Sequence, residues 1–356
     1  MNDFIQQVQF NCQIAAAGQV GFYSLCGMLL RMRQLYKWEQ NLLPWQEGDP
    51  KAVLDWIEMQ EESWSGLEET GLQDLPLNGI RLDPFSVSEL NDLLLPEGLA
   101  YGAGYTHGLA PTCFLGELWE VQKRRDLTVF ILGPELARDL DGSPAMRQGQ
   151  IIYLRTEPLA FYLWDNLSDP TKQNNFFLKI ALAAQGIDLT SLVNRPEEYQ
   201  DQFQTLLQAQ GEAMIHHEIG EALEPSLQKT FAVIIGRLPH TRVERYVRAL
   251  KDTLADLNDW GRVQHLLEQR NLPGLALLLA WRPGFYPYLV PELEPAFWAL
   301  QKSRDWNVMH QARQEALERL RRTAAELDQV LAELAEKSDE ELATALDNRF
   351  IKPLGL

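Results

Sequence analysis

The sequence predicts a mainly α-helical, multi-helical fold with a small two-stranded β element in its N-terminal half. Over long stretches, clearest in residues 3–42 and 305–337, apolar residues recur every three or four positions, which is the spacing of one helix face. Only two short segments, 127–132 and 150–155, have the β-branched and apolar composition of strands. Helix is therefore expected to dominate strand.

The first hundred residues are expected to be helical at their start and irregular afterwards. Residues 3–42 should form one or two long helices, and residues 51–63 a further one, because both segments repeat apolar side chains at helical spacing. Prolines and glycines interrupt this pattern between residues 66 and 111. A loop-rich segment with one short helix at 88–95 is predicted there.

The β element is predicted to come next along the chain. Residues 112–124 are expected to form a helix, and residues 127–132 and 150–155 are expected to pair as the principal hairpin. Between these strands lie a predicted short helix at 134–140 and a turn signal, Asp-Gly-Ser-Pro, at 141–144. Two strands form a small sheet at most, so β structure is predicted to be a minor part of the fold.

A domain boundary is predicted near residues 168–174, where polar residues and a proline cluster. Residues 1–168 would make an N-terminal helical domain with the β hairpin, and residues 169–356 a C-terminal, all-helical domain. Helices are expected in the second domain over 197–223, 226–236, 241–257, 259–269 and 305–337. The last of these has an apolar face along its whole length, so it should bury that face against another helix, within the chain or across a dimer.

The composition is that of a globular protein, with 46% hydrophobic and 23% charged residues among 356 and a formal net charge of −18. This acidity argues against binding to nucleic acid or to an anionic membrane surface, because both need clustered positive charge. Three cysteines without a CxxC pair, and an N-terminus without the basic region of a signal peptide, indicate a soluble cytoplasmic protein. The apolar segment at 14–30 is too short and too polar for a membrane span and is interpreted as a buried helix.

The most informative stretch is 211–224, which lies in a predicted helix and holds two of the six histidines. His217 and Glu221 are four residues apart, so one helix face presents both to a single ion. Imidazole and carboxylate together suit zinc, iron or manganese. The pattern departs from the His-Glu-x-x-His of zinc proteases, because a glutamate replaces the second histidine, and this weakens a protease interpretation. His107 and Glu117 are the first choices for further ligands.

Two other interpretations of this stretch stay open. One is an internal polar network in which an arginine or a histidine partners Glu221, and the other is an unrelated small-ligand site. His216 projects about 100° away from His217 around the helix. Because Glu212 precedes His216 by four residues, these two are interpreted as a pair on the helix surface.

A local basic stripe is predicted on the helix that follows. Arg242, Arg245 and Arg248 recur at intervals of three residues in an otherwise acidic chain. Arginine forks match phosphate and carboxylate groups, so the stripe is a candidate anion-binding site. The alternative is a solvated face on which Glu244 and Arg248, four residues apart, form an ion pair.

Five short segments in the first 165 residues form a recognisable set: 10–14, 25–26, 32–33, 135–140 and 144–146. Together they resemble segments of an uncharacterised bacterial protein family. The resemblance implies no activity, cofactor or site residue.

Two functional hypotheses follow, and neither decides whether the protein is an enzyme. The first is a helical protein that binds a metal ion or small ligand around His217 and Glu221. The second is a non-catalytic interaction or scaffold protein that uses its acidic helical surface and long C-terminal helix, as a homo-oligomer or with a protein partner. A polar pocket at His217 would favour the first hypothesis. An exposed apolar stripe on residues 309–334 would favour the second.

Overall fold

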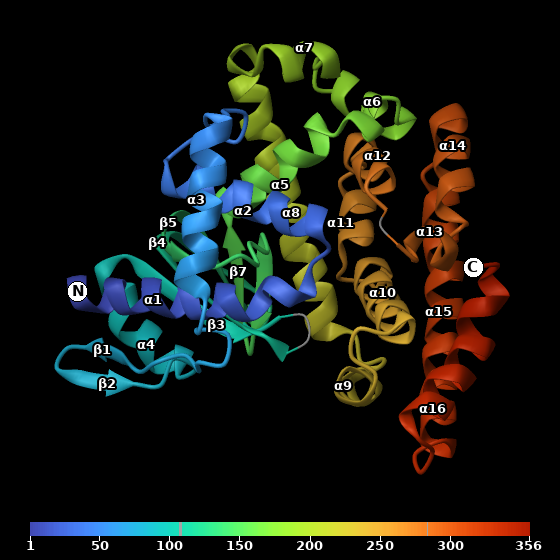
Figure 1. Cartoon of the computed structure of the whole chain (residues 1–356). Helices are drawn as coiled ribbons and strands as arrows, with labels where there is room; N and C mark the ends of the chain where they lie inside the picture. Colours follow the sequence, from blue (N-terminus) through green and yellow to red (C-terminus); the bar gives the residue numbers. More distant parts are fainter. Residues whose placement is uncertain (107–108, 283) are drawn as a thin grey trace. The chain divides into compact units, whose positions relative to one another are not determined.

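The computed structural model describes residues 1–106, 109–282 and 284–356 (Figure 1). Contacts within the chain divide it into two compact units, Met1–Asp169 and Pro170–Leu356. None of the described helices combines the length and the apolar composition that a membrane span requires.

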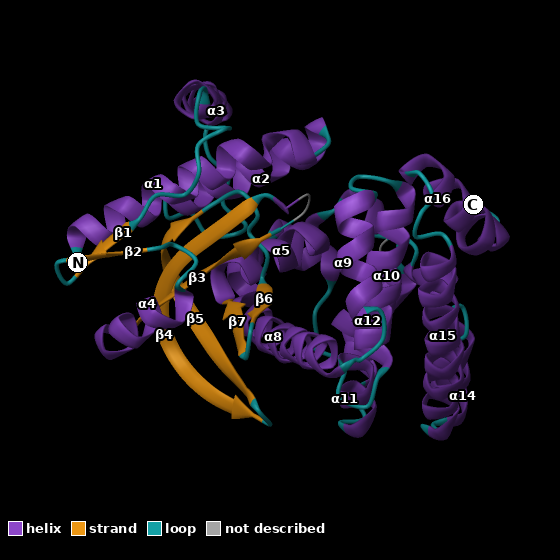
Figure 2. Ribbon diagram, turned by 90° about the horizontal axis from the view of Figure 1, so that it is seen from below, coloured by secondary structure: helices purple, strands orange, loops and turns teal. Residues whose placement is uncertain are grey.

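The first unit is built on a curled, five-stranded mixed sheet (Figure 2). In spatial order the strands are β3 (Leu99–Tyr105), β4 (Pro111–Arg124), β5 (Leu127–Arg138), β7 (Ile151–Arg155) and β6 (Ala145–Gln148). Neighbouring strands are antiparallel except β5 and β7, which run parallel. A separate two-stranded sheet is formed by β1 (Leu75–Leu77) and β2 (Ile80–Leu82).

The predicted fold class is therefore wrong in its β part. The chain is 63% helical, but the described residues form 7 strands rather than one small hairpin. Residues 112–124, predicted as a helix, form most of β4, and the short helix predicted at 134–140 is largely the end of β5. Pairing between strands accounts for the difference, because β4 is hydrogen-bonded to β3 on one side and to β5 on the other.

The predicted hairpin between 127–132 and 150–155 is also wrong, although the two segments are neighbours. They pair in parallel, with Thr128 opposite Ile151. The intervening chain forms a strand of its own, β6, which turns back at Gly149 with a positive φ of 57°. Strand β7 thus pairs antiparallel with β6, and β6 and β7 form the hairpin in place of the predicted one.

Five α-helices described in the first unit pack on its sheet or on one another. They are α1 (Asn2–Gln19), α2 (Leu25–Glu39), α3 (Pro50–Trp64), α4 (Val87–Leu94) and α5 (Thr156–Ser168). Phe4 and Val8 of α1 join Phe114 and Tyr153 of the sheet in one fully buried cluster. The segment predicted as one or two helices at 3–42 is two, α1 and α2, joined through a 3₁₀ turn at Val20–Phe22.

Every regular element described in the second unit is a helix. The α-helices are α6 (Phe176–Ala183), α7 (Leu189–Asn194), α8 (Gln200–Leu223), α9 (Gln228–Arg237), α10 (Arg242–Leu257), α11 (Arg262–Glu268), α12 (Leu272–Ala280), α13 (Tyr286–Leu289), α14 (Leu293–Ser303), α15 (Asn307–Glu333) and α16 (Asp339–Leu346). Shorter 3₁₀ or π turns in the chain are Leu95–Glu97, Pro170–Lys172, Pro196–Tyr199, Asp347–Ile351 and Lys352–Leu354.

The long helix α15 buries its apolar stripe inside the second unit. It packs against α10 and α14, and Leu320 and Leu327 are both 0% exposed. The prediction that this face is covered by another helix is confirmed, and the cover lies within the chain. The apolar stripe that the interaction hypothesis required on 309–334 is thus unavailable on the surface of this unit.

Candidate functional site

The candidate site lies where α8 crosses the turn between α10 and α11. Two glycines allow the close approach, because a Cβ atom on Gly220 would lie 2.1 Å from the carbonyl oxygen of Ala255 and one on Gly261 would lie 2.0 Å from the same oxygen. No other residue fits at either position without a shift of the backbone. The crossing brings His216 and His217 of α8 against side chains from α10 and α11.

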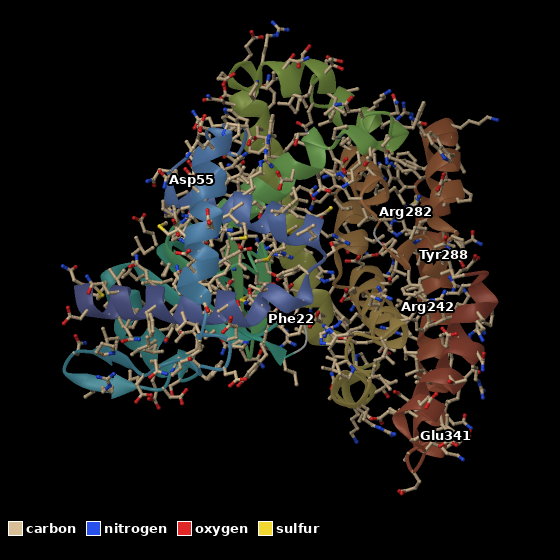
Figure 3. The ribbon with its side chains drawn as sticks, viewed as in Figure 1. Phe22, Asp55, Arg242, Arg282, Tyr288 and Glu341 are labelled. Atoms are coloured by element: carbon tan, nitrogen blue, oxygen red, sulfur yellow. The ribbon has the colours of Figure 1, made fainter. Side chains whose placement is uncertain are left out.

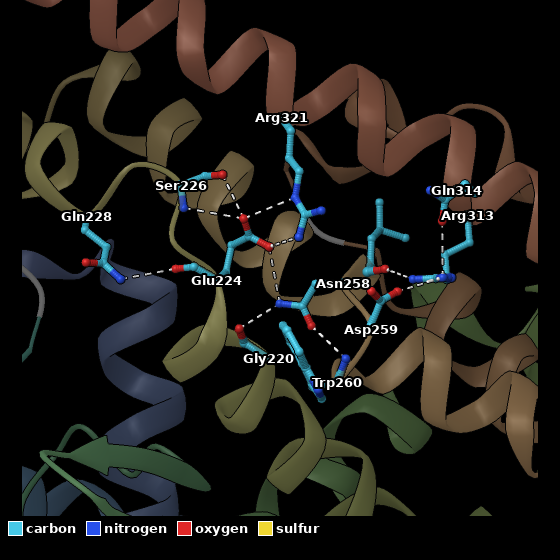
Figure 4. A network of polar contacts seen from close by, with 11 residues as sticks. Gly220, Glu224, Ser226, Gln228, Asn258, Asp259, Trp260, Arg313, Gln314 and Arg321 are labelled. Carbon is cyan, nitrogen blue, oxygen red and sulfur yellow. Dashed lines mark hydrogen bonds and ion pairs between the residues drawn. The ribbon is translucent and has the colours of Figure 1, made fainter. Parts of the chain in front are cut away.

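A buried polar network holds this crossing in place (Figure 4). Glu224, just past the end of α8, accepts a hydrogen bond from Nη2 of Arg321 at 2.8 Å, and its side chain is only 4% exposed. Asn258 donates to the carbonyl oxygen of Gly220 at 2.8 Å and accepts from the backbone N–H of Trp260 at 3.0 Å. The network fixes the loop that carries Trp260 against the end of α8.

His217 is half-buried and forms an ion pair with the buried carboxylate of Asp256. Its Nδ1 lies 2.7 Å from Oδ1 of Asp256, and the other carboxylate oxygen of Asp256 accepts from Arg262 at 2.6 Å. Burial by itself lowers the pKa of His217, but the charge and hydrogen bond of Asp256 outweigh burial and raise this pKa to about 9. Burial would likewise raise the pKa of Asp256, yet Arg262 and His217 outweigh it and lower that pKa. His217 is therefore an imidazolium at neutral pH.

Glu221 lies in the same cluster as His217 and already has a cationic partner. The ammonium of Lys251 is 2.6 Å from Oε1 of Glu221. One ligand atom from each of His217, Glu221 and Asp252 lies within 4.8 Å of the others, so these three could in geometry hold an ion. Together with Lys251, Asp256 and Arg262, however, the cluster contains as many cationic as anionic side chains.

The two further ligands predicted from the sequence are not joined to this cluster. His107 lies outside the described residues. Glu117 is an exposed residue of β4 in the first unit, opposite Leu99 of β3. The convergence of these residues with His217 stays a prediction.

The ion pair of His217 predicts a specific pH dependence of stability. The pKa of His217 in the folded protein, about 9, exceeds the ordinary histidine value of 6.5, so the pair stabilises the fold fully below about pH 6.5 and loses this contribution as the pH rises through 9. Unfolding of wild type and a His217→Gln variant should be compared at about pH 6 and about pH 10. We expect wild type to be more stable by about 2–3 kcal/mol at the lower pH, and this difference to shrink at the higher. A difference that is independent of pH would contradict the assignment.

A second cluster lies on a neighbouring face of α8, next to the face that carries His217. It consists of Glu212, His216 and His265, whose ligand atoms all lie within 4.8 Å of one another. Nε2 of His216 is 3.5 Å from the Glu212 carboxylate, and the rings of His216 and His265 are stacked with centroids 3.8 Å apart. All three residues are half-buried.

The hydrogen bond of His216 fixes which of its ring nitrogens can bind an ion. Nδ1 lies 3.2 Å from the carbonyl oxygen of Trp260, and a carbonyl oxygen only accepts, so Nδ1 carries the proton. In the neutral ring the lone pair is then on Nε2, the nitrogen on the side of Glu212. A backbone carbonyl that holds the far ring nitrogen is the usual support of a metal-binding histidine.

An open hollow of about 550 Å³ adjoins this second cluster. Glu212 and His265 form part of its wall, and the turn from α11 to α12 forms another part through Gln269, Arg270 and Asn271. A small molecule in the hollow would therefore touch two of the three cluster residues.

Family models match nearly the whole chain. The model for the N-terminal domain of a family of unknown function (DUF6866) matches residues 3–155, and the model for its C-terminal domain matches residues 160–349. The chain belongs to the DUF6866 family. No curated protein and no solved structure matches it. Both candidate clusters lie in the DUF6866 C-terminal domain.

Sequence reasoning missed the second cluster in this domain. His216 and Glu212 do lie near each other, but the ligand that turns the pair into a candidate site is His265, which comes from α11. Nothing in the local pattern around His265 distinguishes it from an ordinary surface histidine. Only the crossing of α8 over the α10–α11 turn brings it to His216.

The predicted basic stripe of the DUF6866 C-terminal domain lies on α10, where Arg242 is labelled in Figure 3. Arg242 is 3.5 Å from Asp347, and Arg248 is 2.7 Å from Glu244, while Arg245 is exposed. Two of the three guanidinium groups thus have carboxylate partners within the domain. Anion binding by the stripe stays a prediction.

The DUF6866 N-terminal domain has a buried charge cluster of its own. Glu135 and Arg155 are joined by two hydrogen bonds, of 2.5 and 3.1 Å, and both side chains are 0% exposed. Nε of Arg138 lies 3.6 Å from the same carboxylate. Glu135 and Arg138 belong to the segment 135–140 that carried the family resemblance, and their contacts give that segment a role in holding the sheet together.

Proposed function

We propose that the C-terminal domain binds a divalent transition-metal ion through Glu212, His216 and His265. The observation that carries the proposal is the approach of their three ligand atoms to within 4.8 Å of one another. Two imidazoles and one carboxylate are a donor set that zinc and non-haem iron both accept in proteins. The hydrogen bond from Nδ1 of His216 to the carbonyl oxygen of Trp260 supports the proposal, because it leaves Nε2, the nitrogen near Glu212, to bind the ion.

The charges and ion pairs around His217 disfavour a metal ion there and so favour the second cluster. A metal ion bound to His217 would have to displace a proton from a group whose pKa is about 9. It would also have to compete with the ammonium of Lys251 for Glu221. The pair predicted from the sequence, His217 and Glu221, is therefore proposed to support the fold at the α8 crossing. Three protein ligands would leave a coordination position open to a molecule in the hollow.

Location and organisation form a smaller part of the proposal. Three free cysteines suit a reducing compartment such as the cytoplasm. We also propose a bacterial source for the protein. Residues 1–168 and 169–356 are proposed to be its two functional domains. No observation favours the scaffold hypothesis, because the stripe it required on α15 is buried.

Metal titration of protein purified without an affinity tag tests this function. We expect wild type to bind one equivalent of zinc or cobalt(II), and His265→Ala to weaken binding by about 100-fold or more, because a ligand is removed from a three-ligand site. His217→Gln is the matched control, since it removes a neighbouring histidine of the same helix and should retain one equivalent. Binding that survives His265→Ala but is lost in His217→Gln would contradict the proposal, as would wild type that binds neither metal.

A further inference from the structure

The hollow beside Glu212 and His265 has the chemistry of a site for a small organic anion. We propose that it binds a short carboxylic acid, with one oxygen on the metal ion and a second carboxylate on Arg270. This inference rests on the proposed metal site and adds the class of ligand. The choice of ligand depends on the groups in the wall of the hollow and on the positive charge of Arg270.

The turn from α11 to α12 contributes hydrogen-bond donors to the wall of the hollow. Arg270 offers a guanidinium group, which matches a carboxylate with two parallel hydrogen bonds. Asn271 caps α12 by accepting from the backbone N–H of Gly274 at 2.8 Å, so the side chain's remaining polar group is its NH₂ donor. Glu212, the carboxylate of the wall, is assigned to the metal ion. An anion is therefore the ligand that this wall would bind best.

Arg270 is suited to an external ligand because its side chain is not engaged by the residues that the structure describes. The residue is exposed, and within the described residues its guanidinium makes no ion pair or side-chain hydrogen bond. Other exposed arginines that the structure describes, such as Arg245 and Arg322, are equally without a carboxylate partner, but Arg270 is the arginine in the wall of the hollow. A metal ion on one side and Arg270 on the other would give the hollow two positive poles in an acidic protein.

The rest of the wall limits the size and polarity of the ligand. Ala209, Leu266 and Pro273 contribute apolar surface between the polar groups. A ligand with a short hydrocarbon body and a carboxylate at each end would place its apolar part against these residues. We therefore expect a dicarboxylate to bind better than inorganic phosphate, which has no such body.

The backbone at Arg270 allows a clean test of its side chain. Arg270 follows the end of α11 with φ of +47°, in the left-handed conformation that glycine adopts most readily. Arg270→Gly thus removes the guanidinium without straining the turn. Arg304 is the matched control, because it is exposed, ends α14 with φ of +61° and does not line the hollow.

The experiment follows cobalt(II)-loaded protein by its visible absorption during titration with succinate, and separately with inorganic phosphate and neutral succinamide. Wild type should respond to succinate, and Arg270→Gly should weaken succinate binding by about 10-fold or more while cobalt affinity stays unchanged. Arg304→Gly should match wild type in both respects. A failure to load cobalt would contradict the metal site itself. Three results would overturn the inference and leave the metal site standing. Cobalt could load normally with no response to succinate, or the response to phosphate or succinamide could be stronger than the response to succinate. The two arginine variants could also have equal effects on succinate binding.

Discussion

Replacing Glu135 with glutamine is expected to lower the free energy of unfolding of the N-terminal unit by about 3–5 kcal/mol. The side chains of Glu135 and Arg155 are both 0% exposed, and Arg138 also approaches this carboxylate. Glutamine keeps the shape of the side chain but removes its charge, so two buried guanidinium groups lose their counter-ion. Urea unfolding followed by tryptophan fluorescence measures the effect.

An exposed ion pair gives the control for this change. Glu326 and Arg349 lie 2.7 Å apart, but their side chains are 48% and 50% exposed. Because water screens such pairs, Glu326→Gln should lower stability by less than about 1 kcal/mol. Similar effects of Glu135→Gln and Glu326→Gln would show that the buried cluster is not needed for the stability of the sheet.

Truncating Leu327 on α15 to alanine is expected to cost about 2–5 kcal/mol, and the same holds for Leu320. Both side chains are 0% exposed, so each substitution removes buried methyl groups and leaves a cavity between α15 and its neighbours. Urea or thermal unfolding measures the loss. Leu334→Ala, at a half-buried position just past the end of α15, is the matched control and should cost about 1 kcal/mol or less. Wild-type stability in Leu320→Ala and Leu327→Ala would mean that α15 is solvated.

The helices could be predicted from the sequence because their signal is local. The apolar positions of α15 repeat at helical spacing over the whole element, and burial of one face follows from that pattern alone. The same local pattern predicts helix over residues 3–42, but it leaves open whether one or two helices form there. These elements satisfy their backbone hydrogen bonds within a single segment.

The sheet could not be predicted in the same way, because its hydrogen bonds join separate strands and not residues of one segment. Strand β4 is buried on both faces from Thr112 to Gly116, so it lacks the alternation that marks a strand with one solvated face. Its apolar residues, spaced three or four apart, resemble a helix instead. The end of β5 has a helix-like composition from Pro134 to Arg138, yet Phe114 and Leu115 of β4 pair with this segment. Pairing partners outweighed local preference in both cases.

The candidate site was predictable only as far as one helix extends. The spacing of His217 and Glu221 places both on one face of α8, but their partners Asp256 and Lys251 belong to α10. His265 belongs to α11, so its approach to His216 depends on the glycine crossing at Gly220. Residue types and spacing contain no information about such a crossing.

Anomalous X-ray diffraction at the zinc edge, from crystals of the full chain grown with zinc, tests the metal site most directly. The proposal predicts one peak bonded to His216 Nε2, a ring nitrogen of His265 and the Glu212 carboxylate, at about 2.0–2.2 Å from each. The hydrogen bond from His216 Nδ1 to the carbonyl oxygen of Trp260 should be retained in the zinc-bound protein. A peak between His217 and Glu221, or no peak on the C-terminal domain, would contradict the account.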